Sequence, residues 1–196
     1  MKKTILLPVV TIVLAAAILL GLSAGLNGIA ASNAQSEHLK IMQTVLPDSV
    51  EFTLEPYTGD DNNIRSVHKA ENGFVVETVT SGYAGQITML IGVSNEGYVT
   101  GLVVREAHET FGLGSNALTD HVFLAQFLNK TGEFAVEAPG ADAFSGATAE
   151  TGSDAQSVDA ITGATVTSKA ITRCVNSAVA YVTGADANSG ATSWGG

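Results

Sequence analysis

Gly73-Phe-Val-Val-Glu-Thr-Val-Thr80 is the stretch from which the fold of this chain can be predicted. Valine and threonine dominate it, and the glycine-containing turn Ser81-Gly-Tyr-Ala-Gly85 follows, so the pattern predicts a β-strand. Two further β-rich runs, Ile87 to Val93 and Val99 to Val104, flank the short segment Asn95-Glu-Gly97. Because so short a glycine-containing segment joins antiparallel neighbours, the three runs predict an antiparallel sheet.

Three helices are predicted around this sheet. Residues from Glu37 to Val45 place apolar side chains at helical spacing. Asp120 to Asn129 is predicted to form a second helix, for which Thr119 is the candidate cap. The third is expected from Ser168 to Val182, where the apolar residues form one stripe. The expected fold class is therefore α+β, an antiparallel sheet with packed helices.

Two segments lack a regular apolar pattern. Residues 131–157 are rich in Ala, Gly, Ser, Thr and acidic residues, which predicts a flexible loop. Residues 184–196 have a similar composition and are expected to form a flexible tail. The folded domain is accordingly expected to span residues 37–183.

The N-terminal region is predicted to anchor the chain in a bacterial plasma membrane. Residues 5–27 are almost wholly apolar and uncharged, and they are long enough to span a bilayer core once. Two lysines precede them, which predicts a cytoplasmic N-terminus at residues 1–4 and an extracytoplasmic domain behind a linker at residues 28–36. A secretory signal cleaved near Ser32 or Ala34 is the alternative, but the apolar segment is long for such a signal.

Composition argues against several classes of function. The 196 residues carry a net charge of −10, which repels nucleic-acid phosphates. The single cysteine, Cys174, permits neither an internal disulfide nor a cysteine-held iron–sulfur cluster. Because it lies on an apolar helical stripe, we expect it to be buried rather than reactive. The four histidines lack the spacing of metal ligands, and no metal site is predicted.

The segment Asp159-Ala-Ile-Thr-Gly-Ala-Thr165 stands just before the last predicted helix. Gly163 and Ala164 allow close approach to the backbone. The N-terminus of the helix offers free N–H groups and the positive end of its dipole, which together favour a phosphate. Thr165 presents a hydroxyl there, and Asp159 could hold a metal or position the turn. A plain helix cap by Thr165 or Thr167 explains the same residues, and physical arguments alone favour the cap.

The pattern Asp-x-x-(Ser/Thr)-Gly-Ala-Thr, with Asp159, Thr162 and Thr165 here, resembles the flavin acceptor sequence of the FMN-binding domain family. That domain occurs in the G subunit of Rnf electron-transport complexes and in the C subunit of sodium-translocating NADH:quinone reductase. The resemblance implies that a flavin transferase, with FAD as donor, joins FMN to Thr165 by a phosphoester bond. It also implies that Thr162, Gly163 and Ala164 lie against the cofactor. No side chain is expected to act as a catalytic acid or base.

A second block supports the resemblance. Ser81 to Gly92, Gly97 to Val104 and the segment 108–114 follow the family in order and spacing, with Phe111 where proline is usual. The resemblance implies that five residues of the last segment lie beside the flavin: Glu109, Thr110, Gly112, Leu113 and Gly114. Leu113 would offer the ring an apolar contact. A polar turn without any cofactor contact explains the start of that segment, His108 to Thr110, equally well.

The acceptor pattern occurs twice more, ending at Thr148 and at Thr192. Both copies begin with aspartate, but neither is followed by the Thr-Ser pair and amphipathic helix that follow Thr165. Thr148 and Thr192 are therefore candidate extra acceptors, for which we expect partial modification at most.

Together these features predict a membrane-anchored flavoprotein that carries electrons. By resemblance, it would serve in an Rnf-type ferredoxin:NAD oxidoreductase coupled to movement of Na⁺ or H⁺, with other membrane proteins of that complex as partners. A stand-alone extracytoplasmic FMN carrier is one alternative, and co-purification would distinguish it. A non-redox anchored binding domain is another, and a colourless protein made with flavin transferase present would favour it.

Overall fold

The computed structural model describes residues 36–109, 114–137 and 155–185. No helix within these ranges is both long and apolar enough to cross a membrane. The predicted membrane segment 5–27 and the tail from residue 186 onward lie outside the described residues.

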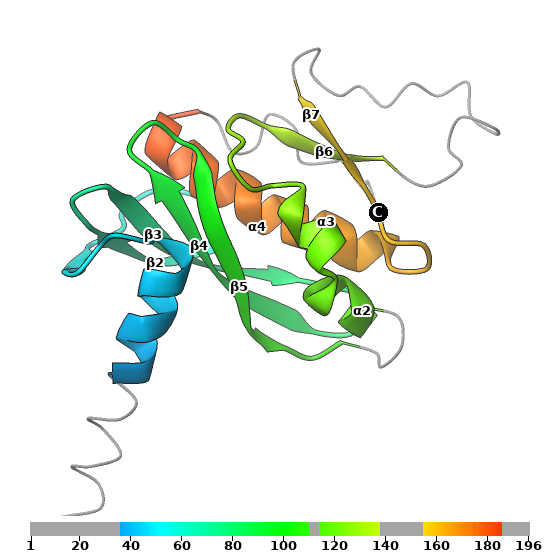
Figure 1. Ribbon diagram of the computed structural model, residues 1–196. Helices are drawn as coiled ribbons and strands as arrows, with labels where there is room; N and C mark the ends of the chain where they lie inside the picture. Colours follow the sequence, from blue (N-terminus) through cyan, green and yellow to red (C-terminus); the bar gives the residue numbers. More distant parts are fainter. Residues whose placement is uncertain (1–35, 110–113, 138–154, 186–196) are drawn as a thin grey trace, which may run out of the picture. The chain divides into compact units, whose positions relative to one another are not determined.

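An antiparallel sheet of five strands, connected in sequence order, forms the centre of the domain (Figure 1). Its strands are β1 (Thr53–Glu55), β2 (Ile64–Lys69), β3 (Gly73–Ser81), β4 (Gln86–Ser94) and β5 (Val99–Ala107). The three strands predicted from the sequence are confirmed. The other two were not predicted, because β1 has only three residues and β2 (IRSVHK) carries a weak apolar signal.

Both faces of the sheet are covered, and alternate side chains of β3 and β4 belong to different cores. On one face, Val76, Met89 and Ile91 are buried in the larger core. On the other, Val75 and Leu90 are buried in a smaller one. Strand β4 is consequently buried over almost its whole length.

Helix α4 (Thr165–Thr183) packs across the first face and supplies most of the larger core (Figure 1). Ile171, Cys174, Val175 and Ala178 are buried there, which confirms the predicted stripe. Burial raises the pKa of the Cys174 thiol to about 11, so the side chain stays protonated near neutral pH, as expected of a core residue. The helix begins at Thr165 rather than at Ser168, a correction that bears directly on the acceptor segment.

The second face is covered by the end of another helix, since residues 36–45 are helical as predicted. Met42, Val45 and Leu46 belong to the smaller core. Gly92 and Gly101 lie opposite each other on β4 and β5, and a Cβ at either would collide with the backbone of Val45. This pair of glycines lets the last helical turn approach the sheet closely.

The helix predicted over residues 120–129 is present but shorter, and a separate helix that was not predicted precedes it. They are α2 (Gly114–Thr119) and α3 (His121–Ala125). Asp120 rather than Thr119 caps α3, because its carboxylate accepts from the amides of Val122 and Phe123 at 2.8 and 2.9 Å. The Thr119 hydroxyl instead donates to a carbonyl within α2.

The predicted loop 131–157 contains two strand segments, which corrects that prediction. They are β6 (Phe134–Glu137) and β7 (Gln156–Asp159), and they pair in parallel. Phe134 joins this small sheet to the core by packing edge-to-face on Phe127, with ring centroids 5.2 Å apart. The remaining loop residues 138–154 lie outside the described residues.

Candidate functional site

A tight turn connects β7 to α4 and contains the centre of the acceptor segment. The Ala164 amide donates to the Ile161 carbonyl at 2.9 Å, and Gly163 between them has φ of 80°. That geometry matches the third residue of a type II turn, a position that favours glycine. Ile161 is held in addition by the Ser168 hydroxyl, which accepts from its amide at 3.2 Å. Glycine in the acceptor pattern therefore has a clear conformational role.

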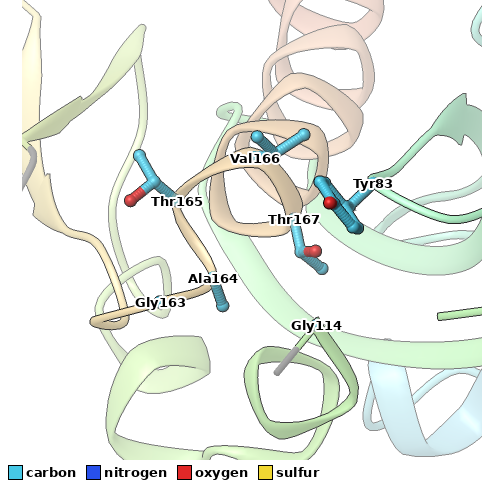
Figure 2. A pocket seen from close by; sticks show the side chains of 7 residues that line it. All are labelled: Tyr83, Gly114, Gly163, Ala164, Thr165, Val166 and Thr167. Atoms are coloured by element: carbon cyan, nitrogen blue, oxygen red, sulfur yellow. The ribbon is translucent and has the colours of Figure 1, made fainter. Parts of the chain in front are cut away.

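Thr165 is the first residue of α4 and does not cap it. The N-cap position is occupied by Ala164, which has no side-chain cap, so capping by Thr165 or Thr167 is corrected. The Thr165 side chain is half-buried, and its hydroxyl makes no hydrogen bond with any described residue. Figure 2 shows it on the opposite side of the helix start from Thr167 and Tyr83. The hydroxyl is thus not committed to holding the fold.

A cavity of about 310 Å³ lies at this helix start. Figure 2 shows the residues that line it, which are Tyr83, Gly114, Gly163, Ala164, Thr165, Val166 and Thr167. Tyr83 and Val166 expose 68% and 50% of their surface, so the cavity has an open, apolar rim. The first amides of α4 add donors and a positive dipole end. Such a lining suits a ligand that combines a phosphate with a flat apolar group.

Glu109 adjoins this cavity through hydrogen bonds to two of its lining residues. One carboxylate oxygen, Oε1, accepts from the Tyr83 amide at 2.8 Å. The other, Oε2, accepts from the Thr167 hydroxyl at 3.3 Å. Thr167 is 1% exposed, so its hydroxyl depends on this partner. Glu109 therefore holds two residues of the cavity lining in place.

Asp159 stands at the end of β7, where a side chain from outside the acceptor segment holds its backbone. The Gln126 amide oxygen accepts from the Asp159 N–H at 2.9 Å, and the Gln126 amide nitrogen donates to the Asp159 carbonyl at 3.2 Å. The Asp159 side chain is exposed. The described residues contain no group of His, Cys, Asp and Glu that could hold a metal. The two hydrogen bonds with Gln126 involve only the backbone of Asp159, so both roles predicted for its side chain, holding a metal and positioning the turn, stay predictions.

The structure brings most of the predicted site residues of the described ranges together. Gly114, Gly163, Ala164 and Thr165 line the cavity, and Glu109 adjoins it. Thr162 is exposed in the turn. Five predicted residues lie outside the described ranges: Thr110, Gly112, Leu113, Thr148 and Thr192.

Three cavity residues were missed by sequence reasoning: Tyr83, Val166 and Thr167. The signal for Tyr83 was a large aromatic side chain inside a glycine-rich turn, a place where burial in the core is not expected. Val166 and Thr167 directly follow Thr165, and a helix that begins at Thr165 brings both into its first turn.

Sequence comparisons connect this geometry with known proteins. The FMN-binding domain family matches residues 82–180. The G subunit of the Na⁺-translocating ferredoxin:NAD⁺ oxidoreductase complex of Acetobacterium woodii is 32% identical over 141 residues, covering 71% of this chain and 60% of that protein. The G subunit of an ion-translocating oxidoreductase complex of Methanosarcina acetivorans is 34% identical over 164 residues, covering 76% of this chain and 77% of that protein. The chain therefore matches between about three fifths and three quarters of these relatives' length.

A solved structure shares the fold. The C subunit of the Na⁺-translocating NADH-quinone reductase from Parabacteroides distasonis superposes with a TM-score of 0.52 and 18% sequence identity. The superposition covers 82% of this chain and 97% of the other. It supports the α+β architecture of an antiparallel sheet with packed helices.

Proposed function

Because this chain belongs to the FMN-binding domain family, we propose that it is a flavoprotein subunit that carries electrons in an ion-translocating oxidoreductase complex. Relatives named as the G subunits of such complexes support this assignment. The partners would be the other membrane proteins of an Rnf-like complex. FMN supplies the redox chemistry, and the protein supplies attachment, orientation and a tuned environment.

The attachment point in this proposal is Thr165. The observation that carries it is a hydroxyl at the first residue of α4, beside the cavity and without a hydrogen bond to any described residue. A flavin transferase would form the bond between Thr165 Oγ1 and the FMN phosphorus of FAD. The pyrophosphate bond breaks, AMP leaves, and the hydroxyl loses its proton. No oxidation or reduction accompanies this step.

The residues around Thr165 fit the role of holding a flavin phosphate. The free amides at the start of α4 can donate to phosphate oxygens, and the helix dipole favours their negative charge. Gly163 and Ala164 keep the backbone of the preceding turn close to the attachment point. Tyr83 and Val166 offer apolar surface at the rim, where a ring system could be partly shielded from water. The protein's own contribution is therefore binding and orientation.

A membrane anchor at residues 5–27, with the domain outside the cytoplasm, completes the proposal. The uncharged apolar run behind two lysines supports it. Labelling of single introduced cysteines in intact cells, on a Cys174→Ala background, would test it. Positions in the domain should react with an impermeant reagent, and protection of all of them until the cells are lysed would contradict the orientation.

The test of the attachment is mass spectrometry of the full chain produced with and without a flavin transferase. With the enzyme, the intact mass should increase by one FMN less one water, and peptide mapping should locate the adduct at Thr165. An unmodified protein in the presence of an active transferase would refute the proposed function. A uniform population carrying two flavins would instead make Thr148 or Thr192 a true acceptor, and one carrying three would make both of them acceptors.

A further inference from the structure

Glu109 joins two segments that are distant in sequence and that both line the cavity. Its Oε1 accepts from the Tyr83 amide, in the turn between β3 and β4. Its Oε2 accepts from the hydroxyl of Thr167, 58 residues away in the first turn of α4. Both Tyr83 and Thr167 line the cavity. One carboxylate thus connects the rim of the site with the helix that begins at Thr165.

Two glycines lie directly against this carboxylate. A Cβ at Gly82 would collide with Glu109 Oε1, and a Cβ at Gly114 would collide with Glu109 Oε2. Gly114 also lies close to the hydroxyl of Thr167, since its added Cβ would be 2.7 Å from that oxygen. Charge-assisted hydrogen bonds of this kind are the stronger ones in proteins. Glu109 is therefore packed between the two segments that it connects.

We propose that Glu109 is a positioning residue that fixes the separation of Tyr83 from the start of α4, and so sets the width of the flavin cavity. The inference deepens the proposed function and rests on it for the identity of the ligand. Sequence resemblance had suggested a direct flavin contact for Glu109. The geometry points to a role through Tyr83 and Thr167, because each carboxylate oxygen accepts a hydrogen bond from one of these residues.

Hydrogen exchange of the flavin-free protein tests the positioning role of Glu109 without any need for flavin. Glu109→Ala should speed exchange of the Tyr83 amide by about tenfold or more, because that amide loses a charged acceptor. Exchange across residues 161–168 should rise as well. Thr167→Val removes only one of the two bonds, so it should loosen residues 161–168 while the Tyr83 amide stays protected.

The conservative variant Glu109→Gln should retain both hydrogen bonds. Its amide oxygen can accept from the Tyr83 N–H, and its amide nitrogen can donate to the Thr167 hydroxyl, which then acts as the acceptor. A positioning role predicts near wild-type exchange for Glu109→Gln. A matched control is Asn176→Ala, which removes two bonds between α4 and Phe134, of 3.0 and 2.9 Å, away from the cavity. It should leave the exchange of the Tyr83 amide unchanged.

The flavin-loaded protein gives a second measurement. In Glu109→Ala, a wider cavity should make the flavin fluorescence at least about twofold more accessible to iodide quenching, with flavin still attached. Glu109→Gln and Asn176→Ala should match the wild type. Unchanged exchange and quenching in Glu109→Ala would overturn the inference. So would a Glu109→Gln protein with wild-type exchange but a shifted flavin redox potential, since the charge itself would then act on the ring. A wild-type protein that never acquires flavin would refute the proposed function instead. The exchange data on the flavin-free protein would still test the positioning role of Glu109.

Discussion

Replacing Thr165 by alanine should separate the chemistry of this residue from its contribution to the fold. The hydroxyl forms no hydrogen bond with a described residue, so its loss leaves no known partner unsatisfied. Removing the half-buried γ-methyl group costs about 0.4 kcal/mol, half of the value for a fully buried methylene. Alanine has the higher helix propensity, by at most about 0.7 kcal/mol. These terms oppose each other, and the free energy of unfolding should change by less than about 0.5 kcal/mol.

Attachment of FMN, in contrast, should be lost from this site entirely. No other atom there can form the phosphoester, whereas Thr165→Ser retains a hydroxyl and should still be modified. Urea denaturation of the flavin-free proteins measures the stability, and peptide mapping after incubation with transferase and FAD measures the attachment. Thr167→Ala is the matched comparison, because that hydroxyl is buried and bonded to Glu109. It should lower the free energy of unfolding by about 1 to 2 kcal/mol.

Two results would refute this reasoning. FMN on the peptide spanning residues 159–173 of Thr165→Ala would show that the attachment residue is wrong. A loss of more than about 1.5 kcal/mol in that variant would show that the hydroxyl stabilises the fold after all. The difference in the free energy of unfolding between Thr165→Ala and Thr167→Ala is therefore as informative as either value alone.

Three further predictions concern the turn and the core. Gly163→Ala should destabilise the protein by about 1 to 2 kcal/mol in urea denaturation, because φ of 80° strains a residue with a Cβ; a neutral result would contradict the turn geometry. The buried Cys174 thiol, with its pKa raised to about 11, should bind its proton more tightly in the folded than in the unfolded chain. Relative to Cys174→Ala, wild-type stability should then be constant below pH 9 and fall by roughly 2 to 3 kcal/mol between pH 9 and 11, and a parallel pH profile of the two proteins would count against it. Phe127→Ala should cost about 3 to 5 kcal/mol in the same assay, because Phe127 is fully buried with its ring against Phe123 and Phe134; a loss below about 1 kcal/mol would mean that this core can rearrange.

Local pattern was sufficient to predict the sheet centre and the helices that carry long apolar stripes. Strands β3, β4 and β5 each have nine residues rich in Val, Ile and Thr, so their signal is strong without any neighbour. Strand β6 was not predicted, because four residues inside an Ala- and Gly-rich region show little periodicity. Its pairing with β7 joins segments about 20 residues apart, and parallel pairing of that kind leaves no turn signature in the sequence.

The proposed acceptor Thr165 and the turn residue Gly163 were predicted from sequence alone, because both belong to a short linear pattern that resembles the acceptor sequence of the family. The start of α4 was not, since Ser and Thr side chains suggested a cap while the chain instead enters the helix through Ala164 and a glycine turn. The partner of Thr167 could be found only in the folded chain. Glu109 is 58 residues away, and no rule of spacing connects them. Sequence determines which groups are available for hydrogen bonding, whereas the tertiary structure decides which of them pair. The physical reason is that a buried donor without a partner is costly, so each one pairs with an acceptor that packing brings near it.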